Sequence, residues 1–583
     1  MSAPIVVLKL GGSVLTGEDA LATAVHEVYR HVRQGRRVLA VVSAMSGATD
    51  ALLQRGRALD GEDAPHGLAP LLATGEAQAT ALLVLALERA GIPARAMEPH
   101  SVGLRADGPP MDATPYTIDA DAFRRAFEFA PALVLPGFVA RDAEGSRVLL
   151  GRGGSDLTAL FSATALGAER CVLVKDVDGM YDRDPHTPGP APRRFSHVGW
   201  HTALSLSGVI LQEKGARFAL DHRRPFEVMA LGRRDGTTIG DFEDRFAEDD
   251  APTRPLRVGL LGLGTVGGGV LRRLAGAPTR FACAGAVVRD PARPRDDAPP
   301  LYADVRELLA QRPDVIVEAL GELEPARTWV AQALEAGVHV ISANKSLLAE
   351  HGPELAALAH AHGVTLADSP AVGGAVPCME LTRASAALGV THLEGVLNGT
   401  TTFVLDRVAE GDDLAHAVDL ARQAGLAEAD ATLDLDGTDA AQKLMLLARA
   451  AWGVDVPLEW TRSGGLTDLD EAWVRTEAGQ GRRVRLVGRA QLDQRGARLA
   501  LGLESLDPDD GMGRTRKSQC ALRILRSDGT LVSTIGRGAG RWPTAEAVMG
   551  DVLLIEDLCG TAHEQRPQPT SAPGAETPPT EPS

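Results

Sequence analysis

The chain has 583 residues, of which 44% are hydrophobic and 23% are charged, close to the average for globular proteins. This composition excludes disorder over the whole chain, and the length predicts about four domains or subdomains. The net charge of −17 argues against a broad electrostatic grip on nucleic acid or anionic lipid.

The first part of the chain, residues 1–240, alternates apolar strands with helical stretches. Strands are expected at 4–10, 37–42, 132–135 and 171–174, and loops rich in Gly or Asp follow them. This alternation predicts an α/β domain with a mostly parallel sheet. Ligands of such sheets bind beyond the carboxyl ends of the strands, so these loops are the candidate site.

Five short motifs follow one another in this region. The first, Lys9-Leu-Gly11-Gly12-Ser13, places an ammonium group beside open backbone N–H groups, which suits nucleotide phosphates. It is not the GxxxxGK[ST] P-loop. Any one motif is typical of an ordinary glycine-containing turn, whereas five in order are not. The other four lie at 41–50, 74–76, 151–156 and 175–185.

Together these motifs resemble the amino-acid kinase superfamily, most closely aspartokinase, over about residues 4–235. The resemblance implies an αβα sandwich in which Lys9 and Asp156 serve phosphoryl transfer from ATP with Mg²⁺. Glu76 suits an ammonium group, and Arg152 offers a planar fork to a carboxylate. The resemblance also implies that L-aspartate is held by Ser43, Thr49, Glu76, Arg152 and Ser155. The nucleotide would be contacted by Gly11, Gly12, Lys175, Asp176, Tyr181 and Asp184.

The kinase half departs from the family pattern in three places. Val14 follows Ser13 where the family has a Thr-Ser pair, and Lys175 replaces a more usual threonine. Gly208 and Val209 stand in the best register for the family's Gly-Ala-Lys, with Lys214 nearby as a candidate substitute for that lysine.

A second α/β unit begins near Leu256, after an acidic segment without periodicity at 241–254 that we predict to be a linker. Gly262-Leu-Gly264-Thr-Val-Gly267 follows an apolar strand and precedes a helix expected at 266–274, the context of a dinucleotide-binding motif. The three glycines allow the tight turn, the approach of the pyrophosphate and helix–strand packing, respectively. The cofactor residues expected here are Gly262, Gly264, Thr265, Val266 and Gly267.

The nicotinamide cofactor is expected to be NADP(H). Arg289 follows the second strand of this unit, and an arginine there suits a 2′-phosphate. NAD stays open as an alternative, because Asp290 is placed to take a ribose hydroxyl.

The rest of the chain first continues this unit and then changes pattern. Further strands are expected at 284–288, 315–318 and 338–341. After about residue 380 amphipathic helices and strand-like segments alternate, which predicts an α+β domain. Asp439 and Lys443 are four residues apart and share a helix face. The helices are expected at 414–424 and 440–451, and the strands at 484–487 and 499–503.

Residues 255–470 and the motif at 538–551 closely resemble homoserine dehydrogenase. Reduction of an aldehyde needs hydride from the nicotinamide and a proton for the developing alkoxide, and a lysine ammonium supplies that proton and its charge. The resemblance implies that Lys443 and Lys345 are catalytic, with Asp439 beside them. It places Glu428, Asp434, Asn398 and Thr400 on the substrate and Ser342 and Gly538 on the cofactor.

The same resemblance raises the question of a monovalent cation. The family usually has a glutamate before its Ala-Val-Gly-Gly loop that helps to hold the ion, and Ser369 stands there instead. We expect the backbone oxygens of Val372, Gly374 and Val376 to bind Na⁺ more weakly. Thr402 also replaces a usual asparagine after the Asn-Gly-Thr loop.

Lysine is scarce in this sequence, which gives each one more weight. Of the 60 basic residues only six are lysine, so arginine is the default cation. Lysine has a tunable pKa and arginine does not, which makes a retained lysine a candidate for chemistry. Four of the six lie in the motifs above: Lys9, Lys175, Lys345 and Lys443.

The most direct interpretation is a bifunctional enzyme that phosphorylates L-aspartate and reduces aspartate semialdehyde to homoserine. The alternative is an active dehydrogenase with an inactive kinase-like module that regulates or scaffolds it. The expected divisions are a kinase domain at 1–240, a linker at 241–254, a Rossmann domain at 255–380 to which 536–562 return, a catalytic and dimerisation domain at 381–535, and a disordered tail at 563–583.

Fusions of this kind usually carry small regulatory domains of the ACT type between the two enzymes. The 14 residues from 241 to 254 are too few for such a domain, since a chain below ~40 residues seldom builds a core unaided. We therefore predict that no effector-binding module lies between the two enzymes.

Partners and location follow from simpler observations. No apolar run is seen to reach the ~18 residues of a bilayer span, and Lys9 interrupts the first apolar strand, unlike a signal peptide. Five scattered cysteines without a CxxC pair fit a reducing compartment and no structural zinc. We expect a cytoplasmic homodimer or homotetramer without nucleic acid or membrane partners.

Overall fold

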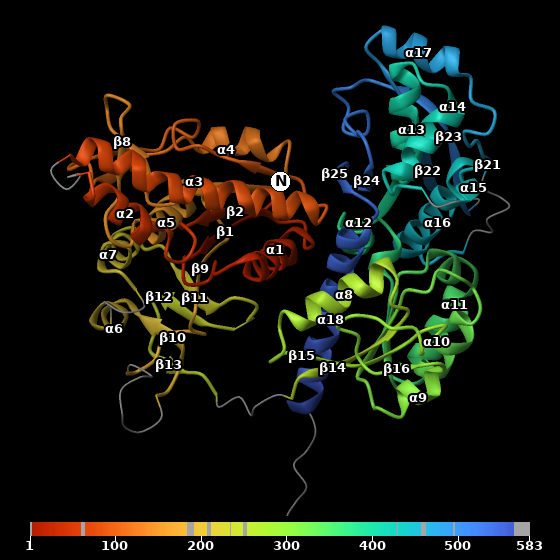
Figure 1. The fold of residues 1–583 in the computed structure, drawn as a ribbon, viewed down its shortest axis with the longest axis horizontal. Helices are drawn as coiled ribbons and strands as arrows, with labels where there is room; N and C mark the ends of the chain where they lie inside the picture. Colours follow the sequence, from red (N-terminus) through yellow and green to blue (C-terminus); the bar gives the residue numbers. More distant parts are fainter. Residues whose placement is uncertain are drawn as a thin grey trace, which may run out of the picture.

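The computed structural model describes residues 3–59, 64–183, 192–206, 211–233, 235–248, 254–427, 430–455, 462–493 and 496–564. Two of the expected site residues, Asp184 and Glu428, lie outside the described residues. Gly208, Val209 and the tail beyond residue 564 lie outside them too. The N-terminal domain and the two domains that follow it in the chain lie side by side (Figure 1).

The N-terminal domain contains the four strands that the sequence predicts, with small shifts at their ends, together with further strands and helices. Its strands are β1 (Ile5–Leu10), β2 (Arg37–Val42), β3 (Ala94–Ala96), β4 (Arg105–Asp107), β5 (Thr114–Thr117), β6 (Ala132–Pro136), β7 (Val139–Arg141), β8 (Arg147–Leu149), β9 (Arg170–Lys175), β10 (Phe195–Gly199), β11 (Phe226–Ala230), β12 (Thr237–Gly240) and β13 (Arg245–Phe246). Its helices are α1 (Glu18–Val32), α2 (Ala48–Arg57), α3 (Pro65–Arg89), α4 (Ala120–Phe127), α5 (Gly154–Leu166), α6 (Trp200–Ser205) and α7 (Glu213–Asp221).

These elements form an αβα sandwich, which confirms the expected fold. The main sheet has the order β13-β10-β12-β11-β9-β1-β2-β6-β3, and its central strands β9, β1, β2 and β6 are parallel. Alternate residues of β1 face opposite layers: Val6 and Leu8 pack with α1 and α3, and Val7 packs with α4 and α5. A smaller sheet, β5-β4-β7-β8, completes the domain.

The segment predicted to be a linker, 241–254, is partly structured. Its strand β13 pairs antiparallel with β10, and the rings of Phe195 and Phe246 stack with centroids 4.5 Å apart. The apolar contact of Phe246 draws this segment onto the edge of the kinase sheet.

Helix α3 corrects the expectation about apolar runs. By length and composition it is long and apolar enough to cross a membrane, because alanines and leucines outweigh its few polar residues. Half of its most apolar window is buried inside the domain, and α3 packs against β6 and β8. It also carries the buried carboxyl of Glu76, so its apolar character is explained by its place in the domain core.

The second domain is a six-stranded parallel sheet with helices on both faces, as the sequence predicts. Its strands are β14 (Leu256–Leu261), β15 (Phe281–Val287), β16 (Leu301–Tyr302), β17 (Val315–Glu318), β18 (His339–Ser342) and β19 (Leu366–Ala367), in the order β16-β15-β14-β17-β18-β19. Helices α8 (Thr265–Ala275) and α18 (Arg541–Glu564) cover one face. Helices α9 (Val305–Leu309), α10 (Ala326–Glu335) and α11 (Lys345–Ala361) cover the other.

The third domain packs helices on one face of a largely antiparallel sheet. Its strands are β20 (Val390–Val396), β21 (Arg462–Ser463), β22 (Arg483–Asp493), β23 (Gly496–Leu506), β24 (Gln519–Arg526) and β25 (Leu531–Arg537), in the order β21-β23-β22-β20-β24-β25. The helices are α12 (Cys378–Ala386), α13 (Gly399–Glu410), α14 (Leu414–Gln423), α15 (Thr432–Leu435), α16 (Thr438–Trp452) and α17 (Glu471–Gly479). The short helix η2 (Ser369–Ala371) leads from the second domain into α12.

Candidate active sites

The glycine motif between β14 and α8 has the local geometry of a dinucleotide loop. Gly262 has a φ of 98°, which only glycine adopts readily, and a Cβ at Gly267 would overlap the carbonyl oxygen of Gly262. A Cβ at Gly264 would meet nothing within 4 Å, and Gly264 and Thr265 are exposed at the start of α8. Space and free N–H groups at a helix N-terminus are what a diphosphate needs.

The neighbouring strand ends complete the edge of this loop. Arg289 is 86% exposed after β15 and forms an ion pair of 2.9 Å with Glu322. At the ends of β17 and β18 the hydroxyl of Ser342 donates to Glu318 at 2.6 Å. Glu318 is fully buried, and burial raises its pKa. Sequence reasoning missed Glu318 because the end of a buried strand carries no motif.

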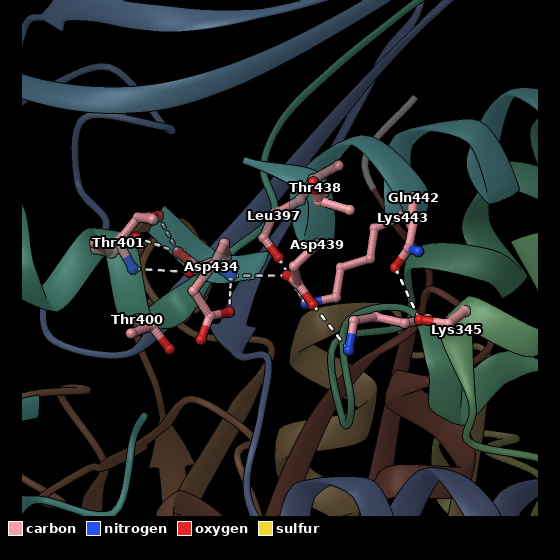
Figure 2. Close-up of polar contacts among 12 residues, drawn as sticks. Lys345, Leu397, Thr400, Thr401, Asp434, Thr438, Asp439, Gln442 and Lys443 are labelled. Carbon is pink, nitrogen blue, oxygen red and sulfur yellow. Dashed lines mark hydrogen bonds and ion pairs between the residues drawn. The ribbon is translucent and has the colours of Figure 1, made fainter. Parts of the chain in front are cut away.

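The two lysines expected to be catalytic lie on one carboxylate, that of Asp439 (Figure 2). The ammonium of Lys443 is 2.8 Å from one oxygen of Asp439, and that of Lys345 is 3.1 Å from the other. Lys443 also donates to the carbonyl of Leu397 at 3.1 Å. Lys345 begins α11 of the Rossmann domain and Lys443 lies on α16 of the third domain, so this contact joins the two domains.

The charges of this cluster are strongly coupled. Burial alone would raise the pKa of Asp439, but Lys443 and Lys345 hold it at about 2. Burial would lower the pKa of Lys443, and Asp439 outweighs it, so the pKa lies above the usual value. Lys443 is therefore a protonated donor at neutral pH.

The expected substrate residues Asn398 and Asp434 belong to the same network. The amide of Asn398 donates to Asp434 at 2.6 Å and to Asp439 at 2.7 Å, and its oxygen caps α13 through the N–H of Thr401. Burial, followed by the charge of Asp439, raises the pKa of Asp434. The hydroxyl of Thr400 donates to the carbonyl of Leu426 at 2.8 Å.

A second charge centre lies at the carboxyl ends of the kinase strands. Lys9 on β1 is 2.8 Å from one oxygen of Asp156, and Lys175 at the end of β9 is 2.7 Å from the other. Lys9 and Asp156 are 6% and 3% exposed. Burial lowers the pKa of Lys9; for Asp156 burial acts to raise the pKa, but the two lysines lower it.

Lys214, the candidate substitute for the lysine of the family's Gly-Ala-Lys, forms contacts away from Asp156. Its ammonium donates to Asp112 and to the carbonyl of Ala113, both at 2.8 Å, and to the carbonyl of Leu150 at 3.0 Å. The second ammonium on Asp156 therefore belongs to Lys175. The structure brings Lys9 and Lys175 together because their strands are parallel neighbours.

The residues expected to hold aspartate lie around the same strand ends. Glu76 of α3 is 3% exposed and accepts a bond from the N–H of Ala44 at 3.3 Å, and its other oxygen has no hydrogen-bond partner among the described residues. Burial raises the pKa of Glu76 to about 7. Ser43 follows β2 and Thr49 lies in the first turn of α2, both half-buried. Arg152 is exposed, shortly before the buried Ser155 at the start of α5.

The expected nucleotide residues follow β1 and β9. A Cβ at Gly12 would lie 2.8 Å from the carbonyl oxygen of Ala44, so only glycine fits this turn. Asp176 is exposed, and the hydroxyl of Tyr181 donates to Asp178. The described residues hold no group of three or more His, Cys, Asp or Glu side chains able to bind a metal.

Of the three carbonyl oxygens expected to bind Na⁺, one already accepts a hydrogen bond. The carbonyl of Val376 accepts the N–H of Cys378 at 2.7 Å. Ser369, at the family's glutamate position, lies 3.1 Å from the guanidinium of Arg33, a cation from the kinase domain. The two carboxylates that reach this place, Glu380 and Asp551, are already paired with Arg33. We therefore derive no step that depends on a bound cation.

A glycine loop of this geometry on a parallel sheet, with two lysines on one carboxylate at the junction to the next domain, is typical of an oxidoreductase that uses a nicotinamide cofactor. Three family models match the chain: the amino acid kinase family over residues 4–221, the NAD-binding domain of homoserine dehydrogenase over 262–367, and homoserine dehydrogenase over 377–553.

Individual relatives agree with these matches. A homoserine dehydrogenase of Synechocystis is 33% identical over 53% of this chain and 75% of that protein. One of Pseudomonas aeruginosa is 34% identical over 52% and 72%, respectively. A crystal structure of a homoserine dehydrogenase from Thiobacillus denitrificans is 33% identical and covers 54% of this chain and 76% of that one, with a TM-score of 0.49.

The chain belongs to the homoserine dehydrogenase family, and an amino acid kinase domain precedes its dehydrogenase domains. Both halves act on small molecules, and no finding favours the alternative of an inactive kinase-like module.

Proposed function

We propose that the protein phosphorylates L-aspartate to 4-phospho-L-aspartate with ATP and reduces L-aspartate 4-semialdehyde to L-homoserine with NADPH. The observation that carries the second activity is the Lys443–Asp439–Lys345 cluster, with contacts of 2.8 and 3.1 Å. The family matches of both halves make the pair of activities consistent with one biosynthetic route.

The reduction needs a proton where the aldehyde oxygen becomes an alkoxide, and the bound nicotinamide supplies the hydride. Lys443 is buried and protonated at neutral pH, so it is our candidate for the donor to that oxygen. Asp439 fixes the direction of the ammonium. Asp434 is our candidate to receive the substrate's α-ammonium group, and Asn398 would hold that carboxylate in place.

The preference for NADPH over NADH is a finer assignment than the family matches give. The exposed Arg289 favours NADPH, since its guanidinium suits a 2′-phosphate and its partner Glu322 is itself exposed. NAD stays the alternative.

For the kinase, ATP with Mg²⁺ is the expected donor, and the ion neutralises phosphate charge when bound. Lys9 and Lys175 would hold the transferred phosphoryl group from two sides, while Asp156 keeps both ammonium groups in place. Glu76, one oxygen of which has no hydrogen-bond partner among the described residues, is our candidate to bind the aspartate ammonium. Na⁺ is not part of this proposal.

Location and assembly are also proposals. The five cysteines are free thiols, which fits the cytoplasm. We propose a homodimer or homotetramer.

The test measures both reactions on one sample of full-length protein. Asp156→Asn should abolish ATP-dependent aspartyl hydroxamate formation and leave semialdehyde-dependent NADPH oxidation intact, because the two sites are in separate domains. Asp121→Asn is the matched control, since Asp121 is exposed on α4. Absence of hydroxamate in the unmodified protein would refute the kinase activity, and absence of NADPH oxidation would refute the reductase.

A further inference from the structure

The kinase domain meets the dehydrogenase domains along one face of helix α1. His26, Tyr29 and Arg33 are spaced three and four residues apart, so they share this face. Opposite them lies α18 with Glu546 and Asp551, and His26 bonds to the fully buried Glu546. Figure 1 shows α1 turned towards α8 and α18.

Arg33 reaches furthest into the dehydrogenase. Its Nε donates to Glu380 at 2.6 Å, and its Nη2 donates to Ser369 at 3.1 Å and also to Asp551. The side chain is only 12% exposed. A Cβ at position 550 would overlap the guanidinium, so Gly550 leaves the space that Arg33 fills.

This arginine pairs directly with the buried carboxyl of Asp551. Asp551 is 1% exposed, and its second oxygen has no hydrogen-bond partner among the described residues. Burial raises the pKa of Asp551 to about 6 against the opposing effect of Arg33. Removing one partner of such a buried pair leaves an uncompensated charge, so this site depends on Arg33.

The segment that Arg33 contacts is connected by packing to Lys443, the proposed proton donor. Ser369 and Glu380 stand at the two ends of the loop that contains Gly374. A Cβ at Gly374 would lie 3.1 Å from the carbonyl oxygen of Gly538, and Gly538 packs directly on Cys520. Glu380 itself lies on α12, and α12 packs against α16, the helix that carries Lys443.

A second contact from the kinase domain supports the same region. The carbonyl of Gly91 accepts the N–H of Arg537, the residue before Gly538, at 3.2 Å. The ring of Trp542 lies between the guanidinium groups of Arg89 from the kinase domain and Arg273 from α8, 4.9 and 5.2 Å from its centroid. The kinase domain therefore also contacts the segment around Gly538, through Gly91 and Arg89.

We propose that Arg33 is a positioning residue of the dehydrogenase that the kinase domain donates: it fixes residues 369–380, and through the packing of α12 on α16 it fixes the place of Lys443. The inference rests on the proposed reductase activity. It gives the kinase domain a structural part in the other reaction, in addition to its own catalysis.

The test compares Arg33→Met with Arg30→Met in the full-length chain. Arg30 lies on the same helix but bonds within the kinase domain, to Glu27 and to the carbonyl of Arg233. Arg33→Met should lower kcat for NADPH oxidation by about tenfold or more, as a small misplacement of reacting groups does, with KM for the semialdehyde within about twofold. Arg30→Met should change neither constant, and both variants should keep kinase activity.

Hydrogen exchange supplies a readout that needs no turnover. Backbone amides of residues 369–380 should exchange faster in Arg33→Met than in Arg30→Met. Arg33→Lys keeps the charge but loses the forked contact, so its kcat should fall between wild type and Arg33→Met even if the methionine variant folds poorly.

Three outcomes would overturn the inference. The first is an unchanged kcat with unchanged exchange at 369–380. The second is a parallel loss of kinase and reductase activity, which would indicate general destabilisation. The third is unchanged exchange at 369–380 in a protein that lacks reductase activity. The missing activity refutes the proposed function, and the unchanged exchange refutes the inference separately.

Discussion

Asp439 receives two ammonium groups that arrive on helices of different domains, so its side chain is held from two directions. Lys443 on its own would be destabilised by burial, and the carboxylate of Asp439 offsets that cost. The identity of each cation matters because a lysine ammonium can give up its proton, whereas an arginine guanidinium cannot.

Replacement of Lys443 by arginine tests this point with the charge kept. The longer guanidinium side chain would not fit the contact with Leu397 and would hold its proton too tightly to donate it. We expect Lys443→Arg to lower kcat for NADPH oxidation by at least about 100-fold. Lys517→Arg is the matched control, since Lys517 is exposed in the same domain. Activity within about threefold of wild type would rule out proton donation by Lys443.

Glu76 predicts a pH dependence for the kinase half. Its pKa is about 7 because burial disfavours the carboxylate, so the fraction ionised rises from about a tenth to about nine tenths between pH 6 and 8. Only the ionised form attracts the aspartate ammonium, so KM for aspartate should fall about tenfold over this interval.

The control variants isolate the role of Glu76. Glu76→Gln should raise KM and remove the trend, whereas Glu98→Gln, at an exposed site, should leave it. A trend that persists in Glu76→Gln would assign the pH dependence to another group.

At the scale of an element, the two glycines Gly264 and Gly267 of the β14–α8 turn serve different purposes. Gly264 faces open space and Gly267 faces the carbonyl of Gly262. Gly264→Ala should leave Tm within about 2 °C and raise KM for NADPH about tenfold, equivalent to about 1.4 kcal/mol.

Gly267→Ala should act in the opposite way. Its Cβ would overlap backbone, so overpacking costs about 1–3 kcal/mol and lowers Tm by about 3–10 °C. Thermal unfolding and steady-state kinetics on the two variants provide the check. Equal Tm values for both would contradict the geometry.

The elements that the sequence predicted are those with local signals. Strand β14 and helix α8 follow from an apolar run and a glycine motif, and the Asp439–Lys443 pair follows from helical spacing. The pairing of Lys345 with Asp439, by contrast, joins residues distant in sequence, and only the family resemblance placed both in one site.

Other features had no sequence signal at all. Arg33 is one of many arginines in an arginine-rich chain, and its role depends on how two domains meet. The same holds for Glu318, whose fully buried carboxyl accepts a hydrogen bond from Ser342. Lys175 was expected at the nucleotide, whereas its contact with Asp156 became visible only through the pairing of β1 with β9.

For the whole molecule, the order of the domains bears on regulation. Between β12 and β14 the described residues form only the short strand β13, and the family models leave 222–261 unmatched. An effector module between the enzymes would need a separate folded unit there.

We therefore expect millimolar threonine to change the kinase rate by less than about twofold, because coupling requires a second site. The assay is hydroxamate formation with threonine titrated at fixed aspartate. Saturable inhibition that is non-competitive with aspartate would reveal a regulatory site in this chain.

The interface along α1 also helps to hold the two enzymes together. The halves are joined by the chain between Phe246 and Leu256, but also by the fork of Arg33, the Gly91–Arg537 bond and the stacked Trp542. A protease that cuts between Phe246 and Leu256 should therefore yield two bands on a denaturing gel and a single particle on a sizing column. On this view, peptide continuity brings the partners to each other during synthesis, and the folded surface keeps them together afterwards.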